Sequence, residues 1–135
     1  MTTREDLESF FIRMGVDHDE VEDGLWVIKQ QESSTTVVVN YSPPVVLLRL
    51  KVMDLPPDND DGRYAALYRK LLEFNATDIL HGSYGIEAAE VVLSDALELE
   101  DLDFSELRSS FESLLFAATS HLPELAGLVP VAHEG

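Results

Sequence analysis

The chain contains no cysteine among its 135 residues. Disulfide bridges, thiol nucleophiles and thiolate metal ligands are therefore excluded. A chain of this length buries enough apolar surface to fold as one domain without a disulfide or a structural metal. Its hydrophobic content of 45% is an ordinary globular value, so we expect a folded domain.

Basic residues are scarce. Nine lysines and arginines stand against 26 aspartates and glutamates, which gives a formal net charge of -17. A field of this sign repels nucleic acid phosphates and anionic membrane surfaces, so direct nucleic acid binding is not expected. The acidity has two interpretations, solubility or attraction to a basic partner, and the charge alone does not distinguish them.

Long hydrophobic runs are also missing. The longest, from Leu114 to Ala118, is far shorter than the roughly 20 residues that a helix needs to cross a bilayer. The first six residues lack the pattern of a signal peptide. We therefore expect a cytoplasmic protein that does not bind membranes.

Signatures of catalysis and of nucleotide binding are missing as well. The sequence has no Walker-type loop and no Gly-x-Gly-x-x-Gly. The histidines at positions 18, 81, 121 and 133 show no close pair with metal-ligand spacing, so structural or surface roles are predicted for them. With 26 carboxylates, closeness in sequence does not identify an acid–base pair. No catalytic residue, cofactor or metal ligand is therefore predicted.

The residues that are present form helix and strand patterns in turn. Thr3 and Asp6 have the spacing of a capping box, which predicts a helix over 4–14 that ends at Gly15. The charged segment 16–24 has no sustained period and is predicted to be a loop. Runs of β-branched and alternating apolar residues then predict strands over 25–29, 35–39 and 45–53.

The second half of the chain repeats this alternation. The predicted elements are a helix over 62–74, strands over 79–86 and 90–94, and a helix that begins at Asp103 and ends at Pro123. Asn75 is predicted to close the first of these helices as a left-handed cap. Proline in a helix removes a backbone hydrogen bond, so Pro123 is expected to stop the last helix.

The resulting element order is α-β-β-β-α-β-β-α. Hairpins dominate and no βαβ alternation forces parallel pairing, so the fold class is α+β, an antiparallel β-sheet with flanking helices. We expect a single domain over 1–123, followed by an apolar C-terminal tail over 124–135.

Three stretches and this element order resemble a known family. Residues 67–75, Leu-Tyr-Arg-Lys-Leu-Leu-Glu-Phe-Asn, form a leucine-rich helical segment that ends in asparagine, and residues 82–86, Gly-Ser-Tyr-Gly-Ile, form a glycine–aromatic strand. Residues 91–93, Val-Val-Leu, lead toward the long final helix. The chain resembles YbjN-like domains and the related class I type III secretion chaperones over nearly its whole length.

The resemblance implies a small acidic homodimer that binds segments of other proteins without ATP. The predicted function is a non-catalytic protein-binding module of the chaperone or adaptor type. Two alternatives stay open: an acidic partner of a basic protein, acting by charge or as a nucleic-acid mimic, and a small enzyme whose site is assembled from scattered carboxylates and histidines.

The dimer or partner contact is predicted near the end of the chain. Apolar side chains after Pro123 lack an obvious partner in the domain as predicted, and the last helix carries further leucines. The predicted contact residues are Leu115, Leu122, Leu125, Leu128 and Val129.

Overall fold

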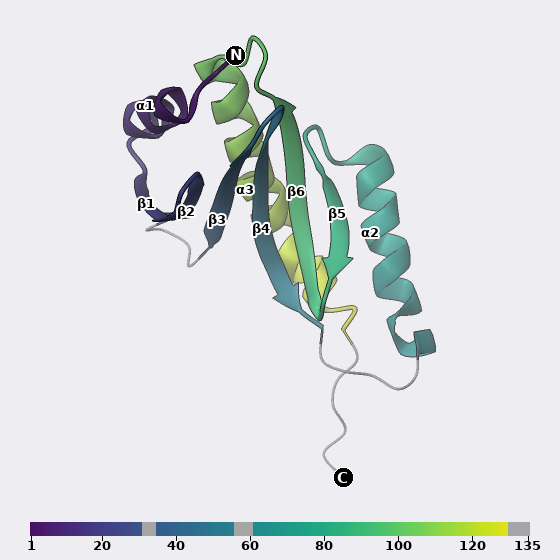
Figure 1. The fold of residues 1–135 in the computed structure, drawn as a ribbon. Coiled ribbons are helices and arrows are strands. Elements are labelled where there is room, and N and C mark those ends of the chain that lie inside the picture. Colours follow the sequence, from purple (N-terminus) through teal and green to yellow (C-terminus); the bar gives the residue numbers. More distant parts are fainter. Residues whose placement is uncertain (31–34, 56–60, 130–135) are drawn as a thin grey trace.

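The computed structural model describes residues 1–30, 35–55 and 61–129, and its centre is a six-stranded antiparallel sheet (Figure 1). The strands lie side by side in the order β1-β2-β3-β4-β6-β5. After β4 the chain leaves the sheet, and it returns through β5 at the edge and then β6 beside β4. The strand bounds are β1 Asp17–Glu22, β2 Leu25–Lys29, β3 Thr36–Ser42, β4 Val45–Asp54, β5 Ser83–Glu87 and β6 Glu90–Glu98.

Three α-helices accompany the sheet. They are α1 Arg4–Met14, α2 Ala65–Thr77, which follows the short 3-10 helix η1 Asp61–Tyr64, and α3 Phe104–Ala126. In Figure 1, α3 crosses behind the strands, α1 lies beside β1 and β2, and α2 runs along β5. The face of the sheet that is turned toward the viewer carries none of these helices. The predicted α+β class is confirmed, and the predicted elements occur in the predicted order.

The core lies between the sheet and helices α1, α2 and α3. Side chains of a strand point alternately to the two faces of a sheet, and Trp26 and Ile28 of β2 are both fully buried on the core side. They share one apolar cluster with Leu48 of β4 and with Leu107 and Leu114 of α3. Burying a large apolar side chain stabilises a fold by about 1.5–3 kcal/mol, so this alternation fixes which face of the sheet the helices cover.

Residues 16–24 contain strand β1, so the prediction of a loop there is wrong. β1 pairs with β2 along its length, and a turn at Asp23 and Gly24 joins the two strands. Gly24 has a φ of 76°, a left-handed conformation that glycine adopts without strain. Because β1 is an edge strand with mostly exposed side chains, pairing with β2 determines its conformation and no apolar period marks it.

Helix α2 continues past Asn75, so the prediction of a left-handed cap at this residue is wrong. The side chain of Asn75 turns toward β5 instead. Its Oδ1 accepts a hydrogen bond from the Tyr84 N–H at 2.6 Å, and its Nδ2 donates to the Tyr84 carbonyl oxygen at 3.2 Å. The amide of Asn75 therefore bonds the next strand, nine residues along the chain, rather than closing its own helix.

Helix α3 continues through Pro123, so the prediction that this residue ends the helix is wrong. Leu125 is fully buried in the core, and the Lys70 ammonium lies 3.1 Å from the Glu124 carboxylate. These contacts hold the last turn against the rest of the domain, although proline lacks the N–H that the helix would use. The prediction that Leu125 has no partner in the domain is therefore also wrong, and residues 130–135 lie outside the described residues.

Candidate protein-binding surface

Within the described residues, no group of three or more His, Asp or Glu side chains is placed to hold a metal ion. The Nδ1 atom of His18 lies 3.1 Å from the Val16 carbonyl oxygen, and its ring packs 5.4 Å from the ring of Phe11. His133 lies outside the described part of the chain. Over that same part, no helix is both long enough and apolar enough to span a membrane.

The ring of His121 joins α3 to α2 and β5. It stacks on the Phe74 ring at 3.7 Å between centroids, and its Nδ1 lies 2.8 Å from the Tyr84 hydroxyl oxygen. Its Nε2 lies 3.7 Å from a carboxylate oxygen of Asp78. Burial lowers the pKa of His121, against the opposite influence of the Asp78 and Glu124 carboxylates, and burial raises the pKa of Tyr84. With a side chain only 12% exposed, His121 fixes β5 against the two helices.

The five predicted contact residues occupy different environments. Leu115 is half-buried, Leu122 is 40% exposed, and Leu128 and Val129 are half-buried against the core. Leu125 is buried within its own subunit and does not reach the surface. Leu115 and Leu122 are seven residues apart and so lie on one side of α3. The assignment of these residues to a dimer or partner contact stays a prediction.

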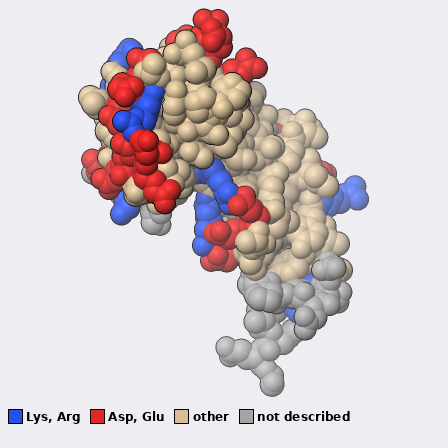
Figure 2. Space-filling model, viewed as in Figure 1, with Lys and Arg blue, Asp and Glu red and all other residues tan. Residues whose placement is uncertain are grey.

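Strand β1, at one edge of the sheet, carries a row of carboxylates. The Oε2 atom of Glu20 accepts a hydrogen bond from the Gly24 N–H at 2.9 Å, which lowers the pKa of Glu20, and Arg4 Nη1 lies 3.1 Å from the same oxygen. Figure 2 shows acidic side chains gathered at this corner, at the upper left. Charges along an edge strand hinder its pairing with a neutral strand of another chain. The exposed acidic residues here are Asp17, Asp19, Glu20, Glu22 and Asp23.

Strand β5 forms the opposite edge and is protected in another way. The Asn75 amide occupies both the N–H and the carbonyl oxygen of Tyr84. A neighbouring strand would use these same two groups. One pairing position of this edge is therefore already filled by a side chain from α2.

The face of the sheet opposite the core is open and carries mixed side chains. Arg49 pairs with Glu87 at 2.5 Å, and Lys51 pairs with Asp54 at 2.7 Å. Figure 2 shows this face as largely uncharged, with a group of both signs near its middle. A shallow hollow of about 360 Å³ lies on it, lined by Thr36, Val38, Arg49, Lys51, Glu90 and Val92.

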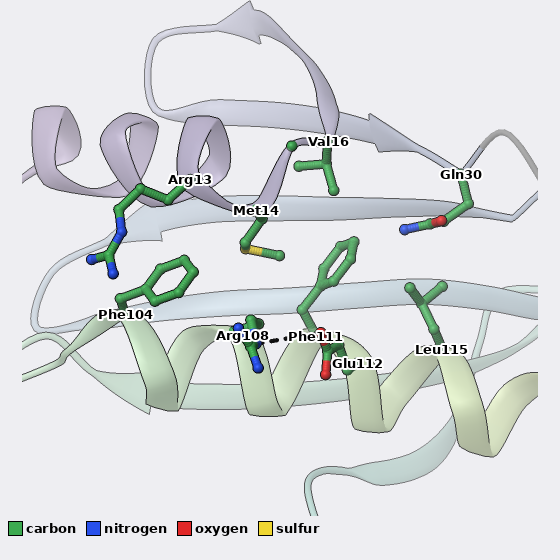
Figure 3. A pocket seen from close by; sticks show the side chains of 10 residues that line it. Arg13, Met14, Val16, Gln30, Phe104, Arg108, Phe111, Glu112 and Leu115 are labelled. Atoms are coloured by element: carbon green, nitrogen blue, oxygen red, sulfur yellow. Dashed lines mark ion pairs between the residues drawn. The ribbon is translucent and has the colours of Figure 1, made fainter.

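A groove of about 490 Å³, here called the α1–α3 groove, lies where the C-terminal end of α1 faces the first half of α3 (Figure 3). The guanidinium carbon of Arg13 lies 3.9 Å above the centre of the Phe104 ring. Arg108 Nε lies 3.4 Å from the Glu112 carboxylate. In Figure 3 Arg13 lies beside Phe104 at one end of the groove, Arg108 lies between Phe104 and Phe111, and Leu115 lies toward the other end. Its lining residues are Arg13, Met14, Gly15, Val16, Gln30, Phe104, Arg108, Phe111, Glu112 and Leu115.

Of the predicted contact residues, only Leu115 lines this groove. The sequence analysis did not single out Arg13, Gln30, Phe104 or Arg108 as site residues. A basic residue in the last turn of a helix is common, because its positive charge interacts favourably with the negative end of the helix dipole. The rarity of basic residues could have drawn attention to Arg13, since only nine residues of the chain are lysine or arginine.

An antiparallel sheet with helices packed on one face is the architecture of type III secretion chaperones. The chain belongs to the CesT_Tir_1 family, a type III secretion chaperone family, whose model matches residues 1–130. This family match confirms the resemblance stated from the sequence. A comparison with curated protein sequences gave no match.

Several solved structures share this fold at low sequence identity. YbjN from E. coli has a TM-score of 0.70 at 11% identity, covering 97% of this chain and 96% of YbjN. A chain of the heterodimeric ExoU–SpcU complex from the type III secretion system of Pseudomonas aeruginosa has a TM-score of 0.66 at 14% identity, covering 87% of this chain and 95% of its own. The complex of the Yersinia pestis secretion chaperone SycH with a fragment of YscM2 gives 0.63 at 18% identity, with 87% and 98% covered.

Proposed function

We propose that this chain is a non-catalytic chaperone or adaptor that binds segments of partner proteins, acts as a homodimer and works in the cytoplasm. Membership of a secretion chaperone family supports a protein-binding role. The observation that carries the proposal is the α1–α3 groove, which is lined by aromatic, aliphatic and hydrogen-bonding side chains. Its volume of about 490 Å³ is within the range of natural ligand sites and suits a short stretch of peptide.

The groove leads to the edge of the sheet. Val16 lines the groove and immediately precedes β1, whose other side has no neighbouring strand among the residues that the structure describes. An extended segment that leaves the groove can therefore add to β1, with main-chain hydrogen bonds giving affinity and side-chain pockets giving selectivity. Such binding needs neither ATP nor a cofactor.

The proposed homodimer is supported by large apolar side chains that stay exposed in a single copy. Phe116 of α3 is 76% exposed and Leu80 before β5 is 90% exposed. Leu122, Leu128 and Val129 are retained as proposed contacts on or just after α3. The substitution Leu122→Asp should shift sedimentation equilibrium toward the monomer, and an unchanged mass would remove this residue from the proposed interface.

The partner-binding role is tested by capture with matched variants. Tagged wild-type chain, Leu115→Asp and Leu72→Asp are each incubated with native lysate without ATP, and partner segments are mapped by protection from protease. Leu115 lines the groove, whereas Leu72 is exposed on α2. Wild type and Leu72→Asp should protect the same segments, and Leu115→Asp should lose them. Equal capture by all three variants would contradict binding in the groove.

A second candidate function is supported by the acidic edge. Five carboxylates lie within the seven residues from Asp17 to Asp23, and all are exposed. This row could attract a basic partner by charge alone, without the groove. Exposed charge pairs are screened over about 10 Å at 0.1 M salt, so partners that wash away in high salt would favour this function over the chaperone role.

A further inference from the structure

Arg13 is an unusual cation in a protein with a net charge of -17. Among the described residues, its guanidinium forms no ion pair, although other basic side chains do so. The Arg13 guanidinium carbon instead lies 3.9 Å above the centre of the Phe104 ring. Acidic side chains are abundant in this chain, so a guanidinium that faces an open groove without one is available to an acidic group from outside.

A second guanidinium lies at the same end of the groove. The Arg108 guanidinium carbon is 5.8 Å from the centre of the Phe104 ring, so Arg13 and Arg108 both approach one ring. Glu112 pairs with Arg108 at 3.4 Å and, within the part of the chain that the structure describes, is the only acidic residue that lines the groove. The two arginines and one glutamate leave a local surplus of positive charge, which is opposite in sign to the whole chain.

The remainder of the groove is apolar with one amide. Met14 and Phe111 lie in its middle, and Leu115 and Gln30 lie toward the end away from the arginines (Figure 3). A helix rises about 1.5 Å per residue, so Phe111 and Leu115 lie about 4.5 Å and about 10.5 Å along α3 from Arg108, and a point about 6.6 Å along falls between them. An extended chain advances about 3.3 Å per residue. Two side chains on one face of an extended segment, two residues apart, can therefore reach the arginines and the apolar stretch together.

We propose that the α1–α3 groove selects an extended partner segment that places a carboxylate side chain on the Arg13 and Arg108 guanidinium groups and an aliphatic side chain, two residues along, between Phe111 and Leu115. This inference rests on the proposed function and specifies the chemistry of the partner. Guanidinium groups bind carboxylates through paired N–H donors. The Arg13 guanidinium carbon lies 3.9 Å above the centre of the Phe104 ring, a contact that favours this position of the cation. A segment with a neutral amide in place of the carboxylate loses this charge-assisted interaction.

The test uses two blocked octapeptides as probes. Both have a threonine host sequence with leucine at position five, and position three is either glutamate or its neutral isostere glutamine. Each is titrated into the full chain at low salt, and binding is followed by NMR shifts of the backbone amides around the groove and of the Gln30 side-chain amide. Arg13→Gln, Arg13→Lys and the control Arg69→Gln are titrated in parallel. Arg69 is an exposed residue of α2 that pairs with Glu73 at 3.8 Å, so its substitution removes the same charge away from the groove.

The glutamate peptide should bind wild type about fivefold more tightly than the glutamine peptide, a ratio consistent with an exposed, charge-assisted pair. Arg13→Gln should abolish this preference, Arg13→Lys should keep part of it, and Arg69→Gln should leave it intact. Equal binding of the two peptides at the groove would overturn the carboxylate preference and leave the proposed function standing. The carboxylate preference would also be overturned if neither peptide shifted the groove resonances, or if Arg69→Gln lost the preference for the glutamate peptide as fully as Arg13→Gln does. The proposed function is judged separately by partner capture with Leu115→Asp.

Discussion

Strands β1 and β5 form the two edges of one sheet, but different features hinder each of them from pairing with a strand of another chain. β1 carries exposed carboxylates. Among the described residues, no strand pairs with the backbone N–H and C=O groups on its outer side. β5 lies beside α2, and the Asn75 amide bonds both the N–H and the carbonyl oxygen of Tyr84. One edge is guarded by charge and the other by packing and side-chain hydrogen bonds.

The difference identifies the edge that a partner can use. A charge barrier is removed by a partner segment with suitable side chains, whereas the β5 edge must first lose its bonds to α2. The α1–α3 groove also lies at the β1 end of the molecule, since Val16 joins the two. We therefore expect stability to depend on β5 and partner binding to depend on β1.

The largest effect on stability is expected from Gly82→Ala, just before β5. Gly82 has a φ of 82°, and an added Cβ would lie 2.2 Å from the Ser94 carbonyl oxygen of β6. Strain and overpacking should together cost roughly 3 kcal/mol or more. The control is Gly85→Ala within β5, where the nearest atom is 4.0 Å away on Val92. Urea denaturation should separate the two variants, and similar midpoints would contradict the close approach at Gly82.

Asn75→Ala should destabilise by about 2 kcal/mol, because it leaves two polar groups of Tyr84 without their partner. It should also increase self-association, since the edge of β5 becomes free. Thr77→Ala is the matched control in the same helix. The Thr77 hydroxyl lies 3.0 Å from the Glu73 carbonyl oxygen and 2.8 Å from Asp78 Oδ1, and both contacts are exposed, so its loss should have a small effect. Equal unfolding free energies in urea for the two variants would count against the amide as the cover of this edge.

The packing of His121 against β5 should make the stability of the domain depend on pH. Because burial lowers the pKa of His121, the unfolded chain takes up a proton more readily than the folded one. Stability should therefore decrease as the pH falls below about 6.5, the ordinary pKa of histidine. His121→Phe keeps a ring against Phe74 and should reduce this pH dependence of the urea midpoint. Tyr84→Phe removes the hydroxyl but leaves the imidazole, so it should retain the dependence; identical slopes in wild type and His121→Phe would refute the assignment.

The smallest effect on stability is expected at the acidic edge. The double substitution Asp19→Thr and Glu22→Thr changes exposed side chains of β1, so the unfolding free energy should change by no more than about 0.5 kcal/mol. Self-association should nevertheless rise, because the charge barrier is weaker. The control, Glu98→Gln with Glu100→Gln, removes two charges elsewhere. Analytical ultracentrifugation at one concentration should distinguish the pairs, and equal masses would argue against guarding by charge.

The parts of the fold that follow from local patterns were predictable from the sequence. The capping box of Thr3 and Asp6 is present in the structure, with the Asp6 N–H donating to the Thr3 hydroxyl at 3.2 Å. The predicted hairpin is formed by β5 and β6, with Ala88 in its tight turn. Both depend on residues close in sequence, whose spacing carries the information.

The features that depend on distant contacts were not predictable in the same way. β1 has no apolar period, although Asp23 and Gly24 form a dipeptide typical of hairpin turns that the loop interpretation overlooked. Leu125 is held in the core by packing that outweighs the effect of Pro123. The contact of Arg13 with Phe104 joins two helices 91 positions apart in sequence, from 13 to 104, and requires the tertiary fold.

The most direct test of the central claim is hydrogen–deuterium exchange of the chain with and without a captured partner segment. We expect slower exchange in β1 and in the helical turns that line the α1–α3 groove, with exchange in β5 unchanged. Protection confined to β5, or no change at β1 and the groove in a complex known to be formed, would contradict the claim that partners bind at the groove and the acidic edge.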